Sequence, residues 1–435
     1  MKVFIETLGC PKNFNDSEVA AGILEDNNYV MVNTPDEADV IMLNTCGFIN
    51  DAKKESIDKI FELLEYKTLG KKLVVSGCLS QRYADDLFTE IPEVDAFIGV
   101  NQYDKLPEIL GELDHRKNII TPCDEKILEK HLRKLQDNPY SATLKIAEGC
   151  NNICAYCVIP EIRGRYRSKK EEDVLLEAEE LAQAGCKELI LIAQDVTYYG
   201  KDLYGEFRLA KLLKKLCKIS GIQWIRLMYC YEDRITDELI EVIKSEDKIC
   251  NYLDIPIQHA SNDILKSMNR RSTRESIKNT INRLKTAIPD IHIRTTLIVG
   301  FPGETEDDYD QLVDFVLEEK FSRLGVFGYS KEENTVAGNM KNQIDSEVKE
   351  QRLDGIMRRQ LDISLELNQR EIGKTLDVLV EEKDEENSYL GRSMYDAPEI
   401  DNSVIFTSCK ELKPGDMVKV LINDAFDYDL VGTEV

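Results

Sequence analysis

Three cysteines stand within eight residues of one another in the stretch "EGCNNICAYCVIP", at Cys150, Cys154 and Cys157. Thiolates are metal ligands, and the spacing Cys-x3-Cys-x2-Cys supplies three of them from one loop. A cluster of four irons held by three thiolates keeps one iron open to a ligand from outside the protein. A structural zinc site needs four protein ligands, yet no histidine lies near Cys157 and the next cysteine is Cys186. The spacing therefore favours an iron–sulfur cluster with an open iron over zinc.

Three more cysteines follow predicted strands in the first third of the chain. Cys10 lies in "LGCPKN", Cys46 in "NTCGF" and Cys78 in "SGCLSQRY". In a parallel sheet the carboxyl ends of the strands share one edge, so we expect the three thiols to converge there as a second metal site. The alternative interpretation is that they are small buried side chains at strand ends.

The chain has twelve cysteines in 435 residues. No signal peptide is recognisable in "MKVFIETLGCPKN", so we expect a cytoplasmic protein whose thiols stay reduced and serve as metal ligands rather than in disulfides. No apolar run approaches the roughly 20 residues that a bilayer requires, so no membrane association is expected. Six cysteines lack ligand-like spacing and are interpreted as structural: Cys123, Cys186, Cys217, Cys230, Cys250 and Cys409.

Residues 1–135 alternate between strand-like and helix-like patterns, which predicts a Rossmann-like α/β domain with parallel strands. Strands are expected within 2–8, 38–46 and 71–79, and helices within 16–27 and 52–66. This alternation would carry Cys10, Cys46 and Cys78 to one edge of the sheet. The polar stretch "HLRKLQDNPYSA" is expected to link this domain to the next.

Residues 140–365 repeat the alternation and predict a full or partial TIM-type barrel, with its active face at the carboxyl ends of the strands. Six strands are expected within 142–150, 188–196, 224–231, 252–259, 292–301 and 323–330, with helices such as 171–185 and 275–288 between them. The Cys150 loop follows the first strand. Polar residues on or after later strands are candidates for binding a cofactor: Gln194, Asp195, Gln258, Arg294 and Thr296. Structural hydrogen bonding is the open alternative for each.

Basic residues crowd the stretch after the cysteine loop, at Arg163, Arg165, Arg167, Lys169 and Lys170. They are predicted either to fold over the metal site and hold an anionic group, or to form a solvated start of the following helix. The sequence favours neither hypothesis.

Residues 370–435 show a different sequence pattern, which follows a charged helical stretch at 346–373. Short, often alternating strands are expected within 375–382, 388–394, 403–408, 416–424 and 428–435, with a turn at "KPGD". Some sixty residues of this kind predict a small closed antiparallel β-barrel.

The loop around Cys150 resembles that of the radical S-adenosylmethionine (SAM) enzymes, whose CxxxCxxC motif holds a 4Fe–4S cluster with the open iron chelated by the cofactor. Tyr156, the aromatic residue before the last cysteine, fits the pattern and is implied as part of the cofactor site. By this resemblance Cys150, Cys154 and Cys157 are the catalytic cluster ligands. The reduced cluster and SAM would yield a radical that takes hydrogen from an unactivated carbon.

The N-terminal motifs "TLGCPKNFNDSE", "NTCGFINDAKKES" and "GCLSQRY" resemble one family of these enzymes, the methylthiotransferases. The resemblance continues through "LIVGFPGETEDD" to a C-terminal barrel of TRAM type, and so covers essentially the whole chain. It implies that Cys10, Cys46 and Cys78 hold a second 4Fe–4S cluster, whose open iron takes the sulfur to be inserted. SAM would serve both as methyl donor and as radical source.

Two branches of this family differ in substrate. One modifies an adenosine in transfer RNA, and the other modifies the β-carbon of an aspartate in ribosomal protein twelve of the small subunit. The stretches "CVIPEIRGRYRSK" and "GRSMYDAPEID" resemble the second branch, which implies that ribosomal protein as substrate and an electron donor such as flavodoxin or ferredoxin. The tRNA branch is the runner-up, and a non-enzymatic iron–sulfur protein that binds RNA or senses redox state is the remaining alternative.

The charge of the C-terminal region supports the ribosomal-protein branch. The chain has 81 acidic and 56 basic residues, a net charge of −25, and residues 371–435 alone carry sixteen acidic and six basic residues, a net charge of −10. Binding to RNA phosphates requires basic side chains, so no direct tRNA substrate is expected. An acidic barrel suits a basic ribosomal protein, with a merely solvated acidic surface as the open alternative.

Overall fold

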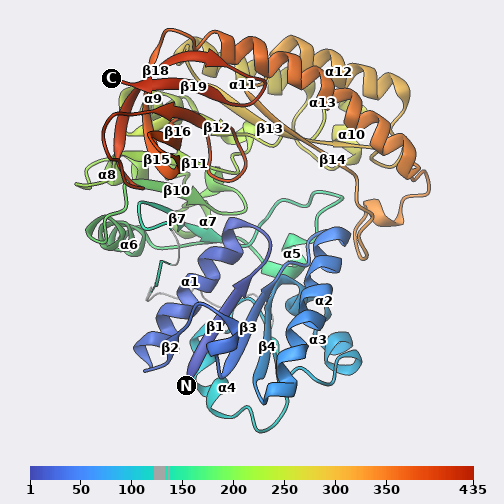
Figure 1. The fold of residues 1–435 in the computed structure, drawn as a ribbon. Coiled ribbons are helices and arrows are strands. Elements are labelled where there is room, and N and C mark those ends of the chain that lie inside the picture. Colours follow the sequence, from blue (N-terminus) through green and yellow to red (C-terminus); the bar gives the residue numbers. More distant parts are fainter. Residues whose placement is uncertain (122–132, 136–137) are drawn as a thin grey trace.

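The computed structural model describes residues 1–121, 133–135 and 138–435, which form two six-stranded sheets, a closed barrel and a two-stranded ribbon. The N-terminal part (blue) and the C-terminal part (red) lie at opposite ends of the middle sheet (Figure 1). The predicted linker at 131–142 falls partly outside the described residues, and Cys123 falls wholly outside them. No helix in the described part of the chain is long and apolar enough to cross a membrane.

The N-terminal sheet is entirely parallel, with strand order β2-β1-β3-β4-β5-β6. Its strands are β1 (Lys2–Thr7), β2 (Val30–Met31), β3 (Val40–Thr45), β4 (Lys72–Gly77), β5 (Ala96–Ile98) and β6 (Lys117–Ile119). One apolar cluster packs α1 (Pro11–Asp26) and α4 (Leu106–Gly111) on one face, and a second packs α2 (Asn50–Leu64) and α3 (Cys78–Glu90) on the other. The predicted Rossmann-like α/β fold is confirmed.

Helix α1 begins earlier than the sequence pattern predicts, helix α3 begins within the stretch predicted as a strand, and both start at the carboxyl edge of this sheet. Helix α1 begins at Pro11, because proline suits the first helical position, where its missing N–H costs nothing, and Cys10 becomes the N-cap residue. Cys78 is the first residue of α3 rather than the end of β4. The cysteines therefore lie in strand-to-helix turns, just beyond the strands.

The middle sheet is also parallel, with strand order β14-β13-β12-β11-β10-β7. Its strands are β7 (Ser141–Lys145), β10 (Glu188–Ile192), β11 (Trp224–Leu227), β12 (Ile249–Asp254), β13 (His292–Val299) and β14 (Arg323–Gly328). All six predicted strands are present, and the sheet stays open between β7 and β14, so the barrel is partial. The outer helices are α6 (Glu171–Gln183), α7 (Lys201–Tyr204), α8 (Leu209–Leu216), α9 (Asp237–Ser245), α10 (Asn262–Ser267), α11 (Arg274–Ala287), α12 (Glu306–Glu319) and α13 (Ser346–Gln369).

Strand β13 shows how the sequence separates the two faces of this sheet. Its burial alternates strictly, and Ile293, Leu297 and Val299 pack into the apolar layer beneath the helices. Arg294 and Thr296 point to the other face and are only partly buried, because they line the inside of the open barrel.

The C-terminal barrel closes in the order β15-β16-β17-β19-β18. Its strands are β15 (Thr375–Glu385), β16 (Ser388–Ser393), β17 (Val404–Thr407), β18 (Met417–Ala425) and β19 (Leu430–Glu434). The predicted small closed β-barrel is confirmed, but it is not wholly antiparallel, because β17 and β19 pair in parallel. It covers the amino ends of the middle strands, where buried ion pairs join Glu188 to Arg392 (2.6 Å) and Arg323 to Asp396 (2.6 Å).

The N-terminal part contacts both edges of the open middle sheet. At the β7 edge, Lys145 pairs with Asp16 of α1. Beyond the β14 edge, Glu332 lies 2.9 Å from the Lys53 ammonium and 2.8 Å from the Arg82 guanidinium. The N-terminal part therefore spans the gap that the six strands leave open.

We expect Glu188→Gln to lower the free energy of unfolding at pH 7 by about 3–5 kcal/mol, because it removes the anion that pairs with the buried Arg226 guanidinium and leaves Arg392 with Glu381 alone. Burial alone would raise the pKa of Glu188, but the two arginines outweigh it and lower this pKa from 4.5 to about 2. The stabilisation is therefore complete above pH 4.5 and is lost as the pH falls toward 2. Urea unfolding at several pH values measures both effects.

Glu180→Gln on the exposed side of α6 is the matched control and should change stability little. Equal effects of the two substitutions would show that the Glu188 ion pairs do not hold the C-terminal barrel in place.

Candidate active site

The loop with Cys150, Cys154 and Cys157 lies beyond β7, between β8 (Ala147–Glu148) and α5 (Ile159–Arg163), at the carboxyl edge of the middle sheet. Gly149 makes this turn possible, since its φ is +77° and an added Cβ would lie 2.1 Å from the carbonyl oxygen of Arg165. Hydrogen-bonding groups lie near all three sulfurs. The Asn152 N–H donates to Cys150 (3.4 Å), the Ile159 N–H donates to Cys157 (3.5 Å), and the Tyr231 hydroxyl lies 3.6 Å from the Cys154 sulfur. The two backbone donors favour thiolate ligands.

Asp195 positions this loop. The Asn152 amide donates to its carboxylate (3.2 Å), and Arg234 pairs with it while also donating to the Asn152 side-chain oxygen (2.7 Å). Burial raises the pKa of Asp195, although the Arg234 charge opposes this. Asp195 was predicted to bind a cofactor; in the structure its carboxylate contacts the residues that fix the loop.

The three N-terminal cysteines lie together where α1, α2 and α3 begin. Gly9 (φ +96°) packs so closely on Cys46 that an added Cβ would lie 2.7 Å from the Cys46 Cβ. Gly47 packs on the chain at Cys78 and Leu79 in the same way, with 2.7 Å to the Leu79 Cα. The predicted convergence of these thiols is present in the structure. Burial raises the pKa of Cys46 to about 12 and also raises that of Cys78.

Arg163 joins the two cysteine sites. Its side chain is 1% exposed, and it donates to Asp16 (2.9 Å), to the Asn13 side-chain oxygen (2.8 Å) and to Glu148 (3.2 Å). It also lies 3.5 Å from the Cys78 sulfur. Burial would raise the pKa of Glu148, but the charges of Arg163 and Lys145 together hold it below its ordinary value.

The structure divides the run of basic residues. Arg163 and Lys169 are buried, Arg167 is half-buried, and Arg165 and Lys170 are exposed. Lys169 pairs with Glu177 at 2.9 Å. Neither hypothesis describes the run as a whole, because Arg163 holds anionic side chains of this chain at the junction of the two cysteine sites, while the exposed members are solvated.

The other predicted cofactor residues lie in different surroundings. Gln194 donates to Glu148 (3.0 Å), next to Arg163. Gln258 and Thr296 are brought together, since the Gln258 N–H donates to the Thr296 carbonyl oxygen (2.9 Å) at a φ of +70°. Arg294 instead lies 3.3 Å from Asp401, on the side of the C-terminal barrel. Tyr156 packs against an apolar cluster that includes Met268.

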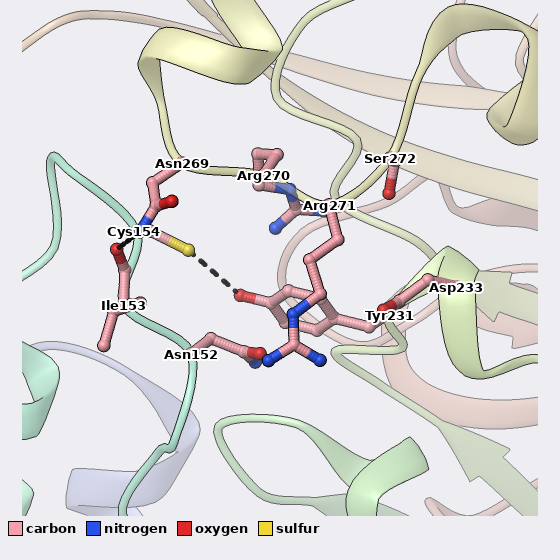
Figure 2. A pocket seen from close by; sticks show the side chains of 9 residues that line it. All are labelled: Asn152, Ile153, Cys154, Tyr231, Asp233, Asn269, Arg270, Arg271 and Ser272. Atoms are coloured by element: carbon pink, nitrogen blue, oxygen red, sulfur yellow. Dashed lines mark hydrogen bonds between the residues drawn. The ribbon is translucent and has the colours of Figure 1, made fainter.

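A pocket of about 90 Å³ opens beside Cys154 (Figure 2). It is lined by Tyr231 and by the segment from Asn269 to Ser272, and the buried Arg270 is held by Glu232 at 2.9 Å. Ligand pockets typically enclose about 300–1,000 Å³, so this pocket by itself is too small for a molecule as large as SAM.

Sequence reasoning missed Lys12 and Tyr229, which meet where the N-terminal sheet faces the open barrel. Lys12 follows Cys10 by two residues, is 8% exposed, and places its ammonium 3.3 Å from the centre of the Tyr229 ring. Tyr229 follows β11 with a φ of +61°. Lys12 stands in the quoted "LGCPKN" motif, but no local pattern distinguishes a lysine that will be buried.

The donor set of each cysteine site fits an iron–sulfur cluster, because each offers three cysteine thiols and leaves the fourth iron open. In the part of the chain that the structure describes, no three Cys, His, Asp or Glu side chains stand close enough to hold one ion. The eleven described cysteines are all free thiols.

Comparison with known proteins agrees with this geometry. Residues 2–99 match Uncharacterized protein family UPF0004, residues 144–316 match the Radical SAM superfamily, and residues 372–435 match the TRAM domain. The fold is similar to that of the radical SAM methyltransferase TsrM from Kitasatospora setae, with a TM-score of 0.57 and 12% identity over 88% of this chain and 79% of that one. The cobalamin-dependent SAM radical enzyme OxsB gives a TM-score of 0.51 and 16% identity, over 83% and 56%.

The fold and the cysteine loop thus define a radical SAM enzyme, which brings an iron–sulfur cluster and SAM as cofactors. Ribosomal protein uS12 methylthiotransferase RimO of Clostridioides difficile (strain 630) is 53% identical over 99% of this chain and 98% of its own length. The same enzyme of Desulforamulus reducens is 49% identical over 98% of each. The chain belongs to the RimO family of ribosomal protein uS12 methylthiotransferases, which confirms the predicted family and enzyme class.

We expect Arg163→Met to lower the free energy of unfolding by about 3–5 kcal/mol, because Asp16 and Glu148 then lose a buried counter-charge. In metal-free protein it should also slow the alkylation of Cys78 by iodoacetamide, measured by peptide mass spectrometry, because the Arg163 charge lowers the pKa of the Cys78 thiol and the thiolate is the form that reacts. Arg165→Met, at the exposed neighbour, is the matched control. An Arg163→Met protein with normal stability and normal Cys78 reactivity would contradict the joining role of Arg163.

Proposed function

We propose that the chain inserts a methylthio group at the β-carbon of an aspartate in uS12, the small-subunit ribosomal protein twelve, using two 4Fe–4S clusters and SAM. The observation that carries this proposal is the pair of cysteine sites joined through Arg163. One site would generate reactivity at a carbon, and the other would supply sulfur to that carbon. The contacts of Arg163 support the proposal that the two sites act together.

Cys150, Cys154 and Cys157 would hold the first cluster, and three thiolates leave its fourth iron for the amino and carboxyl groups of SAM. Cys10, Cys46 and Cys78 would hold the second, sulfur-bearing cluster. Together these groups supply hydrogen abstraction from an unactivated carbon, which side-chain acids and bases cannot perform.

This chain's own residues would orient the loops and exclude water. Asp195 and Arg234 fix the first loop through Asn152, and Gly9 and Gly47 allow the second set of turns to pack without intervening solvent. Gln194, Gln258 and Thr296 would contribute to the SAM site together with Tyr156, whereas Arg294 is left out of this proposal because it pairs with Asp401 on the side of the C-terminal barrel. The positions of Gln258 and Thr296 suit this role best, because both residues line the open barrel, Gln258 beyond the end of β12 and Thr296 on β13.

Each part of the chain would have its own role. Residues 1–135 would hold the sulfur-bearing cluster, and residues 140–365 would carry out the radical chemistry. Residues 370–435 would form a TRAM domain that contacts the substrate protein rather than tRNA. A ribosomal-protein substrate supports action in the cytoplasm. A flavodoxin or ferredoxin would supply the electrons. We infer a monomer.

Replacement of either cysteine set should separate the two half-reactions. Alanine at Cys150, Cys154 or Cys157 should abolish the formation of 5′-deoxyadenosine from SAM. Alanine at Cys10, Cys46 or Cys78 should preserve this cleavage and stop methylthio transfer, and each change should lower iron content by about half. Cys409→Ala, at an exposed cysteine, is the control. Loss of cleavage in the second set would contradict the assignment.

Mass spectrometry should distinguish the substrates. Anaerobically reconstituted protein, reductant and SAM are given a uS12 loop peptide or, separately, unmodified tRNA. A methylthio gain on the peptide aspartate alone is expected, whereas a gain on tRNA alone would retain the two-cluster mechanism and overturn the substrate.

A further inference from the structure

Lys12 is a buried cation beside Cys10 that the mechanism above does not use. It lies in the first turn of α1, beside Cys10, and points across to Tyr229 at the carboxyl edge of the middle sheet. The Tyr229 backbone adopts the left-handed region (φ +61°), which a bulky residue occupies only when its surroundings hold it there. The ring is therefore held against the ammonium from the opposite part of the molecule.

No carboxylate of the described residues pairs with this ammonium. The Lys12 ammonium forms no hydrogen bond there and no ion pair within 4.0 Å; Cys10, Glu148 and Asp254 attract it from farther away, and Arg163 repels it. Glu148 is already paired with Arg163 and Lys145, and Asp254 accepts from the Tyr229 N–H at 3.1 Å. A cation–π contact compensates only part of the lost hydration of a buried ammonium. The arrangement suits an anionic group that arrives from outside the chain.

We propose that Lys12 is a positioning residue that binds the side-chain carboxylate of the substrate aspartate, an inference that rests on the proposed function. The carboxylate carbon is bonded directly to the β-carbon, so an ion pair with Lys12 fixes the reacting carbon one bond away. Cys10, two residues earlier, belongs to the site proposed to carry sulfur. Lys12 thus holds the acceptor carbon next to the sulfur-bearing site.

The same contact distinguishes aspartate from asparagine. An asparagine side chain fills nearly the same volume but brings no charge, so the buried ammonium would stay without an anion. We expect wild-type protein to bind an asparagine version of the uS12 loop peptide about ten- to hundred-fold more weakly than the aspartate peptide.

The test measures peptide binding to the reconstituted protein by calorimetry under anaerobic conditions, with aspartate and asparagine peptides. Lys12→Met should weaken binding of the aspartate peptide about ten-fold or more and leave the asparagine peptide nearly unchanged, so the discrimination is lost. Lys12→Arg should retain part of it. Lys54→Met, at an exposed lysine of α2, is the matched control. Iron content and SAM affinity are measured on every variant.

The possible results distinguish a failure of the Lys12 role from a failure of the proposed function. Equal binding of the two peptides to wild-type protein overturns the role of Lys12 without any variant. A Lys12→Met protein that loses affinity for SAM but still discriminates between the peptides shows that the carboxylate belongs to SAM, which also overturns it. If wild-type protein transfers no methylthio group to the aspartate peptide, the proposed function fails first, and this inference fails with it.

Discussion

A small group of charges, the buried Arg163, Glu148 and Asp16 and the partly buried Lys145, holds the two cysteine sites in fixed relative positions. Isolated charges in a protein interior are strongly destabilising, and they are tolerated only when each one has its partners. Here the partners come from two parts of the chain, because Asp16 lies on α1 of the N-terminal part while the other three belong to β7, β8 and α5. The turn that carries Cys10 and the loop that carries Cys150 therefore cannot move independently without separating these charges.

The opposite end of the middle sheet follows the same principle with different residues. Glu188, Arg323 and Arg294 lie at or near the amino ends of their strands, and each meets a charged partner from the C-terminal barrel. The acidic barrel thus covers the end of the sheet that carries no cysteine loop. Its surface can meet a partner protein without covering the thiols.

Local patterns in the sequence were sufficient to predict most of the fold. Strand and helix periodicity predicted all six strands of the middle sheet, and strand-end placement predicted that Cys10, Cys46 and Cys78 converge, because both depend on short stretches of chain. The partners of Arg163, Lys12 and Arg294 could not be predicted, since a side chain's distant partner leaves no period in the sequence. The short strands β2, β5 and β6 were missed for a related reason: two or three residues are too few to show alternation.

The contacts of Glu332 with Lys53 and Arg82 have a mechanical consequence when they are taken with the contact between Lys145 and Asp16. A closed eight-stranded barrel fixes its own diameter through the tilt and stagger of its strands. Six strands cannot do so, and here the N-terminal part forms ion pairs on both sides of the gap between β7 and β14. The width of the open barrel is therefore set by two parts of the chain together. Loss of the Glu332 ion pairs alters that width without changing any residue inside the barrel.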